Sequence, residues 1–354
     1  MHYFYALHSP ETYMRRCLEL ASLGAGHVAP NPMVGAVLVF EDRIIGEGYH
    51  RQYGGPHAEP ECIDSVPEAD RGLIGRSTLY VSLEPCAHHG KTPPCADLII
   101  RTGIPKVVIG CRDPFPEVNG KGIDRLRAAG VEVETGVLER ECIGLNKRFF
   151  TFHLHHRPYI VLKWAQTASG LIAGDGARWH ISNEITNRLV HKWRSEEASI
   201  LVGPRTALLD DPELTVRLWT GPDPVRLVID KELQLPFSLK LFDGKVRTIV
   251  FNNLQHGQDG HLEYYQLATD TSLIHQLVTA LHRLKLQSVL VEGGARLLQS
   301  FIEEDYWDEA RVITGEELEP PAGLPAPRLL HMRRIGKETI LSDTIRYYEH
   351  DSRG

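Results

Sequence analysis

The residues best suited to chemistry lie between positions 57 and 95. His57 precedes Glu59 by two positions, and Cys86 and Cys95 follow later in the chain, each directly after a proline. One histidine and two cysteines provide three zinc ligands and leave the fourth tetrahedral position for water, which is the catalytic arrangement. Zinc lowers the pKa of this water to about 7. Because Glu59 is placed to transfer protons, the pattern predicts metal-assisted hydrolysis.

Two other interpretations of the same residues involve no catalysis. They could form a structural zinc site, or the thiols could be buried without a metal. Structural sites usually have four protein ligands and cysteines two to four residues apart, whereas Cys86 and Cys95 are further apart. His-x-Glu followed by Pro-Cys and a second cysteine is similar to the zinc deaminase signature, with a longer spacing between the cysteines here. The pattern therefore favours the catalytic interpretation.

Apolar runs and prolines predict the elements that position these residues. Residues 78–83 form a β-branched and apolar run that is typical of a buried strand. Pro85 suits the first turn of a helix, which would place Cys86 near a helix N-terminus that favours its thiolate. Residues 93–94, both proline, predict a second helix start, and residues 54–56 precede a third. We therefore expect all three ligands at helix starts, beside the end of a sheet.

The remainder of the first half alternates between helical and strand patterns. We expect helices at residues 10–24, 121–129 and 139–152, and strands at residues 36–40, 44–49, 106–110 and 131–135. This alternation implies an α/β layered domain. Residues 24–29 match the loose dinucleotide pattern G-x-G-x-x-A, but they follow a helix and not a strand, so we interpret them as a helix C-terminal turn. Residues 153–158 are the expected linker, and we interpret their three histidines as a solvated hinge.

Length and composition limit the class of protein. A chain of 354 residues with 42% hydrophobic and 24% charged residues is expected to form two ordinary globular domains. The net charge of −7 argues against a nucleic-acid partner. Six cysteines form no disulfide framework, which favours a cytoplasmic location. We expect no signal peptide and no membrane segment. The sequence allows a homo-oligomer and does not fix the number of subunits.

Three motifs carry a family resemblance. Asn31-Pro32-x-Val34-Gly35, His57-Ala58-Glu59 and the stretch from Glu84 to Cys95 resemble the bifunctional pyrimidine deaminase/reductase family of riboflavin biosynthesis. The long insert between the cysteines distinguishes this family from deaminases of nucleosides or tRNA, which generally keep the two cysteines close together. The resemblance implies an α/β fold: a cytidine-deaminase-like α/β/α sandwich over residues 1–150 and a dihydrofolate-reductase-like domain over residues 157–354. It also implies two cofactors, zinc and NADPH.

The second half contains patterns that fit a reductase. Strands are expected at residues 159–165, 199–203 and 288–292, with a helix capped by Ser182 and ending near Glu196. Residues 206–217 resemble the family segment T-x-x-x-D-[DN]-P-x-L-x-x-R. The strand before Gly293-Gly294 and the helix after it could bind a phosphate on backbone amides, although glycines at such turns often serve conformation alone.

The resemblance implies a role for each matching residue. Glu59 is the catalytic acid and base, and His57, Cys86 and Cys95 are the zinc ligands. Residues implied to contact the cofactor are Ala165, His180, Thr206, Asp210, Gly294, Ala295, Arg296, Leu297, Leu298, Gln299 and Ser300. Residues implied or expected to contact the substrate are Asn31, His50, Arg194, Leu214, Arg217 and Glu292. Arginine suits the substrate phosphate. The alternative interpretations are that each arginine is a solvent-facing charge, that Asn31 is a turn residue and that His50 is a surface residue.

The implied substrate is a small phosphorylated pyrimidine, 2,5-diamino-6-(5-phosphoribosylamino)pyrimidin-4(3H)-one. Deamination and then reduction by NADPH would give 5-amino-6-(5-phosphoribitylamino)uracil. The sequence departs from the family at Ala168-Ser169-Gly170, usually Leu-Asp-Gly, and at His180, usually tryptophan, with Trp179 displaced by one. Residues 314–328 also differ, and their proline-rich run is expected to form a surface excursion. Two alternatives remain: a deaminase of another aminopyrimidine, nucleoside or tRNA with an inactive second domain, and a non-catalytic zinc-stabilised binding module.

Overall fold

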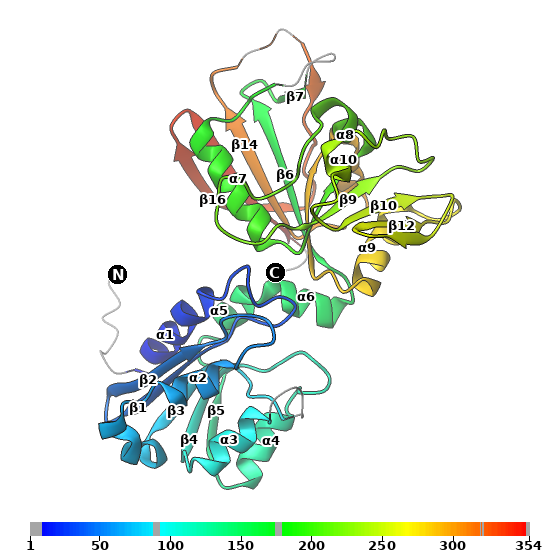
Figure 1. Ribbon diagram of the computed structural model, residues 1–354. Coiled ribbons are helices and arrows are strands. Elements are labelled where there is room, and N and C mark those ends of the chain that lie inside the picture. Colours follow the sequence, from blue (N-terminus) through cyan, green and yellow to red (C-terminus); the bar gives the residue numbers. More distant parts are fainter. Residues whose placement is uncertain (1–8, 88–92, 174–178, 319, 321, 352–354) are drawn as a thin grey trace. The chain divides into compact units, whose positions relative to one another are not determined.

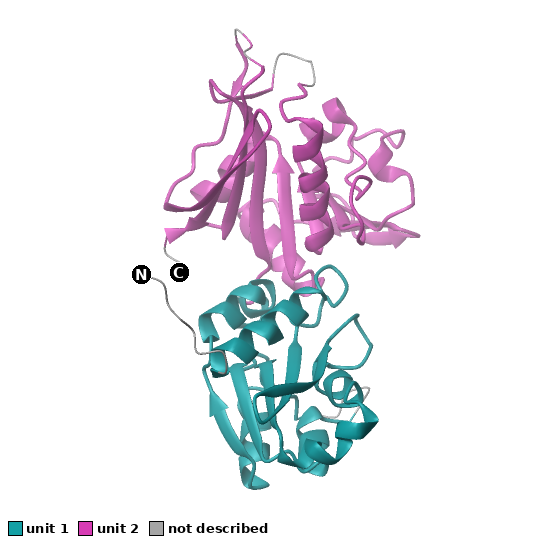
Figure 2. Cartoon of the chain, turned by 90° about the vertical axis from the view of Figure 1, so that its left-hand side faces the viewer, with its two compact units in different colours: residues 1–155 teal, residues 156–354 magenta. Residues whose placement is uncertain are grey.

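The computed structural model describes residues 9–87, 93–173, 179–318, 320 and 322–351. The chain divides into two compact units, Met1–His155 and His156–Gly354, coloured teal and magenta in Figure 2. We call them the N-terminal unit and the C-terminal unit, and we describe each by itself. Within the described segments, no helix combines the length and the apolar character needed to cross a membrane.

The N-terminal unit is built on a five-stranded sheet in the order β2-β1-β3-β4-β5. Its strands are β1 (Gly35–Phe40), β2 (Arg43–Tyr49), β3 (Thr78–Leu83), β4 (Lys106–Cys111) and β5 (Glu132–Thr135). Strand β1 is antiparallel to β2 and β3, while β3, β4 and β5 are parallel. The carboxyl ends of β3 and β4 therefore lie at the same edge of the sheet.

Helices cover both faces of this sheet (Figure 1). One face carries α2 (Ala58–Asp64), η1 (Glu68–Arg76), α3 (Cys95–Arg101) and α4 (Lys121–Ala128). The other face carries α1 (Pro10–Ser22), α5 (Glu139–Leu145) and α6 (Lys147–His155). The expected α/β/α sandwich is confirmed.

The helix expected directly after Pro85 is absent. Residues 84–87 are not helical, and residues 88–92 lie outside the described part of the chain. The Cys86 carbonyl oxygen instead accepts the backbone N–H of Ala96, at 3.1 Å, so this segment lies across the start of α3. Cys86 therefore shares one helix N-terminus with Cys95, and only Cys95 and His57 stand at helix starts of their own.

The long helix expected at residues 139–152 is two helices. Asn146 interrupts it because its side chain bonds both the backbone N–H and the carbonyl of Met33, at 2.8 and 2.9 Å. Helix α6 then continues to His155, so the linker predicted from residue 153 is wrong for its first three residues. The reason is apolar packing: the His153 ring lies 4.4 Å from that of Phe149 and 5.1 Å from that of Phe115, by centroids.

The C-terminal unit contains a ten-stranded sheet in the order β11-β12-β10-β9-β8-β13-β6-β14-β17-β16. Its parallel strands are β6 (Tyr159–Thr167), β8 (Ser199–Val202), β9 (Val225–Ile229), β10 (Thr248–Asn252), β12 (Leu262–Gln266), β13 (Ser288–Gly293) and β14 (Glu309–Gly315). Three antiparallel strands complete it: β11 (Gly257–Asp259), β16 (Met332–Ile340) and β17 (Asp343–His350).

Helices also cover both faces of the large sheet (Figure 1). One face packs against α7 (Glu184–Glu196) and α8 (Pro204–Asp210), and the other against α9 (Leu273–Arg283) and α10 (Ala295–Glu303). A short helix, η2 (Lys240–Phe242), buries Leu241 in one of these cores. A separate pair of strands, β7 (Leu171–Ala173) and β15 (Leu324–Pro325), lies outside the ten-stranded sheet. The neighbours β8, β13 and β6 are parallel but far apart in the chain, and ligands of α/β sheets bind beyond the carboxyl ends of such strands.

One expectation for this unit needs correction. The N-cap of α7 is Asn183 and not Ser182, because the Asn183 side chain accepts the backbone N–H groups of Ile185 and Thr186, each at 3.0 Å. Among residues 314–328, the first two end β14, and the exposed Leu324–Pro325 of the proline-rich run pair with β7 apart from the main sheet, which agrees with a surface excursion.

Candidate active sites

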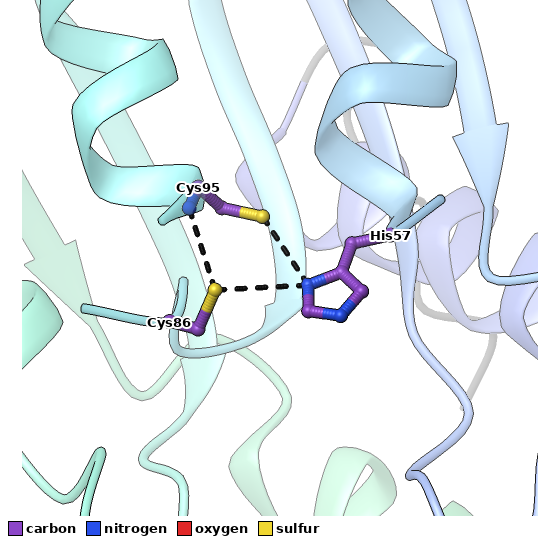
Figure 3. Close-up of side chains that lie close together, drawn as sticks. All are labelled: His57, Cys86 and Cys95. Atoms are coloured by element: carbon purple, nitrogen blue, oxygen red, sulfur yellow. Dashed lines mark hydrogen bonds between the residues drawn. The ribbon is translucent and has the colours of Figure 1, made fainter. Parts of the chain in front are cut away.

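The structure brings the three predicted zinc ligands together (Figure 3). His57 is the N-cap of α2, Cys86 follows β3, and Cys95 is the first residue of α3. The Nδ1 atom of His57 lies 3.6 Å from the Sγ atom of Cys86 and 3.3 Å from that of Cys95. All three ligand atoms lie within 4.8 Å of one another. A zinc ion with ordinary bond lengths places tetrahedral N and S ligands about 3.6 Å apart, so the geometry fits zinc.

The electrostatics of this cluster favour a thiolate. The Sγ atom of Cys86 accepts the Cys95 backbone N–H at the start of α3, at 3.3 Å. Hydrogen bonds from Cys95 and His57 lower the pKa of Cys86 to about 4, against the opposing effect of burial. The Cys86 hydrogen bond in turn raises the pKa of His57 to about 9. A thiolate is the form of cysteine that binds metals, so Cys86 is prepared to be a ligand.

Glu59 lies in the first turn of α2, two residues after His57, and its side chain is buried. Burial raises its pKa to about 7, although the neighbouring His57 opposes this shift. A carboxyl group with a pKa near neutrality can both accept and return a proton. Its position and its acidity therefore suit the role of acid and base predicted from the sequence.

Asn31 and His50 lie at the edge of this cluster. The His50 ring is buried, and its centroid lies 5.5 Å from that of His57. Burial lowers the pKa of His50, so its ring is neutral at neutral pH. Its Nδ1 donates to the Pro56 carbonyl at 2.7 Å, which leaves Nε2 to accept from the Asn31 amide at 3.1 Å. The turn and surface interpretations are therefore insufficient for these two residues.

Glu84 is a positioning residue that sequence reasoning missed. Its buried carboxylate accepts four backbone N–H groups, from Asp113, Gly120, Gly122 and Ile123, at 3.0 to 3.3 Å. These bonds hold the loop before α4 against the Cys86 segment. A Cβ atom at Gly122 would lie 1.9 Å from the Pro85 carbonyl oxygen, so only glycine fits there. A carboxylate at the end of a buried strand is the signal that could have revealed this role.

Asp113 was also missed. Its side chain is buried beside the same segment, and burial raises its pKa to about 7, with the charge of Glu84 adding to the shift. Its Oδ1 atom accepts the Phe115 backbone N–H at 2.8 Å. Asp113 follows β4, which is adjacent to β3, and this explains how the two carboxylates come to lie at one edge of the sheet.

In the C-terminal unit, two glycine turns meet beyond the carboxyl ends of β8 and β13. The Gly203 backbone N–H donates to the Gly293 carbonyl at 3.0 Å. A Cβ atom at Gly294 would lie 3.2 Å from the Thr206 hydroxyl oxygen. Thr206 on α8 and the start of α10 are therefore neighbours. Asp210 lies one helical turn after Thr206 on α8.

The other predicted cofactor residues differ in how accessible they are to a ligand. Leu297 and Leu298 on α10 point into the core, and Ala165 on β6 packs at the edge of the opposite core cluster. On the same helix, Gln299 accepts the Arg328 backbone N–H and the Ser300 hydroxyl bonds the Arg296 carbonyl. The part of α10 that is most accessible to a ligand is its first turn, with its backbone groups, Ala295 and the exposed Arg296.

The positions that depart from the family lie near β7. His180 is exposed, and the neighbouring Trp179 packs so closely on Gly323 that a Cβ atom there would lie 2.5 Å from the ring. Residues 168–170 form the turn between β6 and β7, closed by a bond of 2.9 Å from the Gly170 N–H to the Thr167 carbonyl. The displaced tryptophan is therefore part of the packing around the small two-stranded sheet.

A buried ion pair connects the predicted substrate residues. Arg194 on α7 donates to both carboxylate oxygens of Glu292 on β13, each at 2.8 Å, and Lys163 lies 3.7 Å from the same carboxylate. Burial is the largest single influence on the pKa of Glu292 and would raise it, but the charges of Arg194 and Lys163 and the hydrogen bonds from Arg194 together hold the pKa at about 2. The Arg194 fork is thus committed to Glu292, and a third bond of 3.2 Å reaches the Thr215 carbonyl.

Arg217 is more accessible than Arg194. Its side chain is 48% exposed, against 12% for Arg194. The Arg217 backbone N–H donates to Nδ1 of His191 at 3.0 Å. Burial lowers the pKa of His191 to about 4, and the charges of Arg194 and Arg217 add to this shift, so the His191 ring is neutral and can accept the bond at neutral pH. Leu214, three residues earlier, is buried in the core beneath this loop.

The fold and the first cluster define a zinc deaminase domain, and the second unit has the layout of a nucleotide-dependent reductase. Two family models match: "Cytidine and deoxycytidylate deaminase zinc-binding region" over residues 7–111, and "RibD C-terminal domain" over residues 158–316. The riboflavin biosynthesis protein RibD of Aquifex aeolicus is 40% identical over 315 residues, which cover 87% of each chain.

Solved structures agree with these matches. A diaminohydroxyphosphoribosylaminopyrimidine deaminase/5-amino-6-(5-phosphoribosylamino)uracil reductase from Thermotoga maritima has a TM-score of 0.89 and 36% identity, covering 98% of this chain and 100% of that one. Acinetobacter baumannii RibD has a TM-score of 0.89 and 30% identity, covering 97% and 99%. The chain belongs to the RibD family of riboflavin biosynthesis proteins and is a bifunctional deaminase and reductase. The predicted family, fold class and pair of activities are confirmed.

Proposed function

We propose that the N-terminal unit hydrolyses the exocyclic amine of 2,5-diamino-6-(5-phosphoribosylamino)pyrimidin-4(3H)-one. The C-terminal unit then reduces the ribosyl chain with NADPH to give 5-amino-6-(5-phosphoribitylamino)uracil. The main support is the convergence of His57, Cys86 and Cys95 in zinc geometry despite the long spacing of the cysteines. The Thermotoga maritima deaminase/reductase, which matches this chain over nearly its whole length, supports the same substrate.

In the deamination, His57, Cys86 and Cys95 would hold a zinc ion, which supplies a hydroxide nucleophile at neutral pH. Glu59 accepts a proton from the attacking water and delivers it to the ring nitrogen and then to the leaving amine. A C–O bond forms, the C–N bond breaks, and ammonia departs. Asn31, held by the neutral His50, orients the pyrimidine beside Glu59.

In the reduction, the cofactor supplies a hydride, and the protein supplies position. The free backbone amides at the start of α10, after Gly294, receive the diphosphate of NADPH. Thr206 and Asp210 face the same cofactor from α8. Arg217 binds the substrate phosphate because its side chain is accessible, while Arg194 orients Glu292 toward the substrate.

Incubation with the diaminopyrimidine ribotide, with and without NADPH, tests both steps by mass spectrometry. In Glu59→Gln, deamination should fall by about 10²–10⁴-fold, while zinc content and reduction of the deaminated ribotide are retained. Glu61→Gln is the matched control, since Glu61 lies on the same helix but binds Arg51 at 2.9 Å. A Glu59→Gln enzyme that deaminates at the wild-type rate would contradict the proposed role.

Residues 168–170 and the exposed His180 are positions at which the reductase half departs from the family, so its cofactor binding needs a separate test. Titration with NADPH, followed by the fluorescence of its dihydronicotinamide, measures that binding. Absence of binding, together with no NADPH oxidation in the presence of the deaminated ribotide, would establish a deaminase with an inactive second domain.

A further inference from the structure

A second group of metal-binding side chains lies outside both candidate active sites. Asp305 follows α10, His331 directly precedes β16, and His350 is the last residue of β17. One carboxylate oxygen of Asp305, Oδ1, lies 3.0 Å from Nδ1 of His331 and 3.2 Å from Nε2 of His350. The three ligand atoms all lie within 4.8 Å of one another. Three segments distant in sequence thus converge on one point.

The backbone and the core hold these side chains in place. The Asp351 N–H donates to the His331 carbonyl at 2.7 Å, and the His350 N–H donates to the Asp308 carbonyl at 3.1 Å. The His350 ring packs edge-on against buried Trp307, with centroids 4.9 Å apart. His350 is therefore a fixed ligand at the base of the cluster.

The other two side chains remain open to solvent. The exposed fractions are 50% for the Asp305 side chain and 62% for that of His331, against 1% for His350. An ion can therefore reach the cluster, and the two exposed side chains can adjust to it. This combination of one buried ligand and two adjustable ligands is also what distinguishes the cluster from an ordinary surface ion pair.

We propose that Asp305, His331 and His350 bind one divalent transition metal ion of the zinc class. Imidazole nitrogens suit Zn²⁺, Co²⁺ and Ni²⁺, whereas Mg²⁺ and Ca²⁺ prefer oxygen ligands alone. Ordinary zinc bond lengths place N and O ligands about 3.4 Å apart in a tetrahedral site and about 2.9 Å apart in an octahedral one. The two observed contacts, 3.0 and 3.2 Å, are hydrogen bonds between the imidazoles and the carboxylate, and their lengths also lie between these values.

The metal would connect the ends of the β16–β17 hairpin to the segment between α10 and β14. Strand β16 is an edge strand of the ten-stranded sheet. A ligand that binds only the folded state stabilises it, so metal binding should protect this edge. The ion's role is structural, because neither group of predicted active-site residues includes any of its three ligands.

Metal content of the full-length protein, measured by elemental analysis after equilibration with micromolar free Zn²⁺, tests this proposal. We expect about two zinc ions per chain, one of them at the thiolate site. His331→Ala and Asp305→Asn should each lower this to about one and leave deamination unchanged. His261→Ala is the matched control, because His261 is also an exposed histidine of the C-terminal unit. The variants avoid buried His350, whose replacement could unfold the unit.

Substitution with Co²⁺ distinguishes the two sites by spectroscopy. The thiolate site should show a sulfur-to-cobalt charge-transfer band, which Cys86→Ser with Cys95→Ser removes. The proposed site has no sulfur ligand, so it should add only ligand-field bands and should quench the fluorescence of the adjacent Trp307. Retention of the second metal ion and of the quenching in His331→Ala, or a wild-type content of one zinc per chain, would overturn the proposal.

Discussion

Replacement of Glu292 by glutamine should destabilise the C-terminal unit strongly. The wild-type carboxylate is buried, with 7% of its side chain exposed, and is paired with Arg194 and near Lys163. Glutamine has nearly the same shape but no charge, so the variant leaves Arg194 buried without its counter-charge. Removing one partner of a buried ion pair typically costs about 3–5 kcal/mol.

The pKa of Glu292 gives an independent value for the contribution of its charge to the free energy of unfolding. Burial alone would raise this pKa, but Arg194, with Lys163 and His191 adding, lowers it from 4.5 to about 2. Each pKa unit corresponds to about 1.4 kcal/mol, so the charged form contributes about 3 kcal/mol to the free energy of unfolding at neutral pH. Because the folded-state pKa is depressed, this contribution is complete above about pH 4.5 and is lost as the pH falls toward 2.

The distribution of tryptophan makes the assay specific. All 5 tryptophans lie in the C-terminal unit, between Trp164 and Trp307, so tryptophan fluorescence in a denaturant titration reports the unfolding of that unit alone. Glu263→Gln is the control, because Glu263 pairs with the more exposed Arg247 at 2.6 Å. Loss of that pair should cost at most about 1 kcal/mol.

The result that would refute this reasoning is a small effect. If Glu292→Gln lowers the free energy of unfolding at pH 7 by no more than the Glu263→Gln control, the buried pair does not stabilise the unit as argued. A double-mutant cycle with Arg194→Met gives the coupling directly, and contacting residues are expected to couple by about 0.5–3 kcal/mol. A coupling of zero would also contradict the argument.

Three further predictions concern the active sites. Cys86→Ser combined with Cys95→Ser should lower the zinc content by about one ion per chain in elemental analysis, and an unchanged content would disprove their role as ligands. Arg217→Ala should raise the KM for the ribotide more than that for NADPH in steady-state kinetics, whereas equal increases would argue against a phosphate contact. Glu84→Gln should slow deamination by roughly tenfold or more and spare reduction, because each bond to its charged carboxylate is worth about 1.5–3 kcal/mol; a wild-type deamination rate would exclude this positioning role.

Local sequence was sufficient for most of the elements and for naming the three residues that the structure brings together as candidate metal ligands. The β-branched run at residues 78–83 is β3, and Pro94 before Cys95 begins α3, because both depend on neighbouring residues only. His57 and Glu59 lie at the start of one short helix, so their relation also follows from spacing. In contrast, Pro85 begins no helix, because a tertiary contact with α3 determines the path of that segment.

The pairings between distant residues were decided by tertiary structure alone. Arg194 and Glu292 are 98 positions apart, and they meet because β13 is inserted between β6 and β8 in the sheet. Glu84 binds a loop that starts about 30 residues later. Asp305, His331 and His350 converge because a hairpin returns to the end of α10. Patterns in sequence report the local backbone and the side of an element that is buried. They do not indicate which strands become neighbours in a sheet, and the order of the strands determines which charged groups meet.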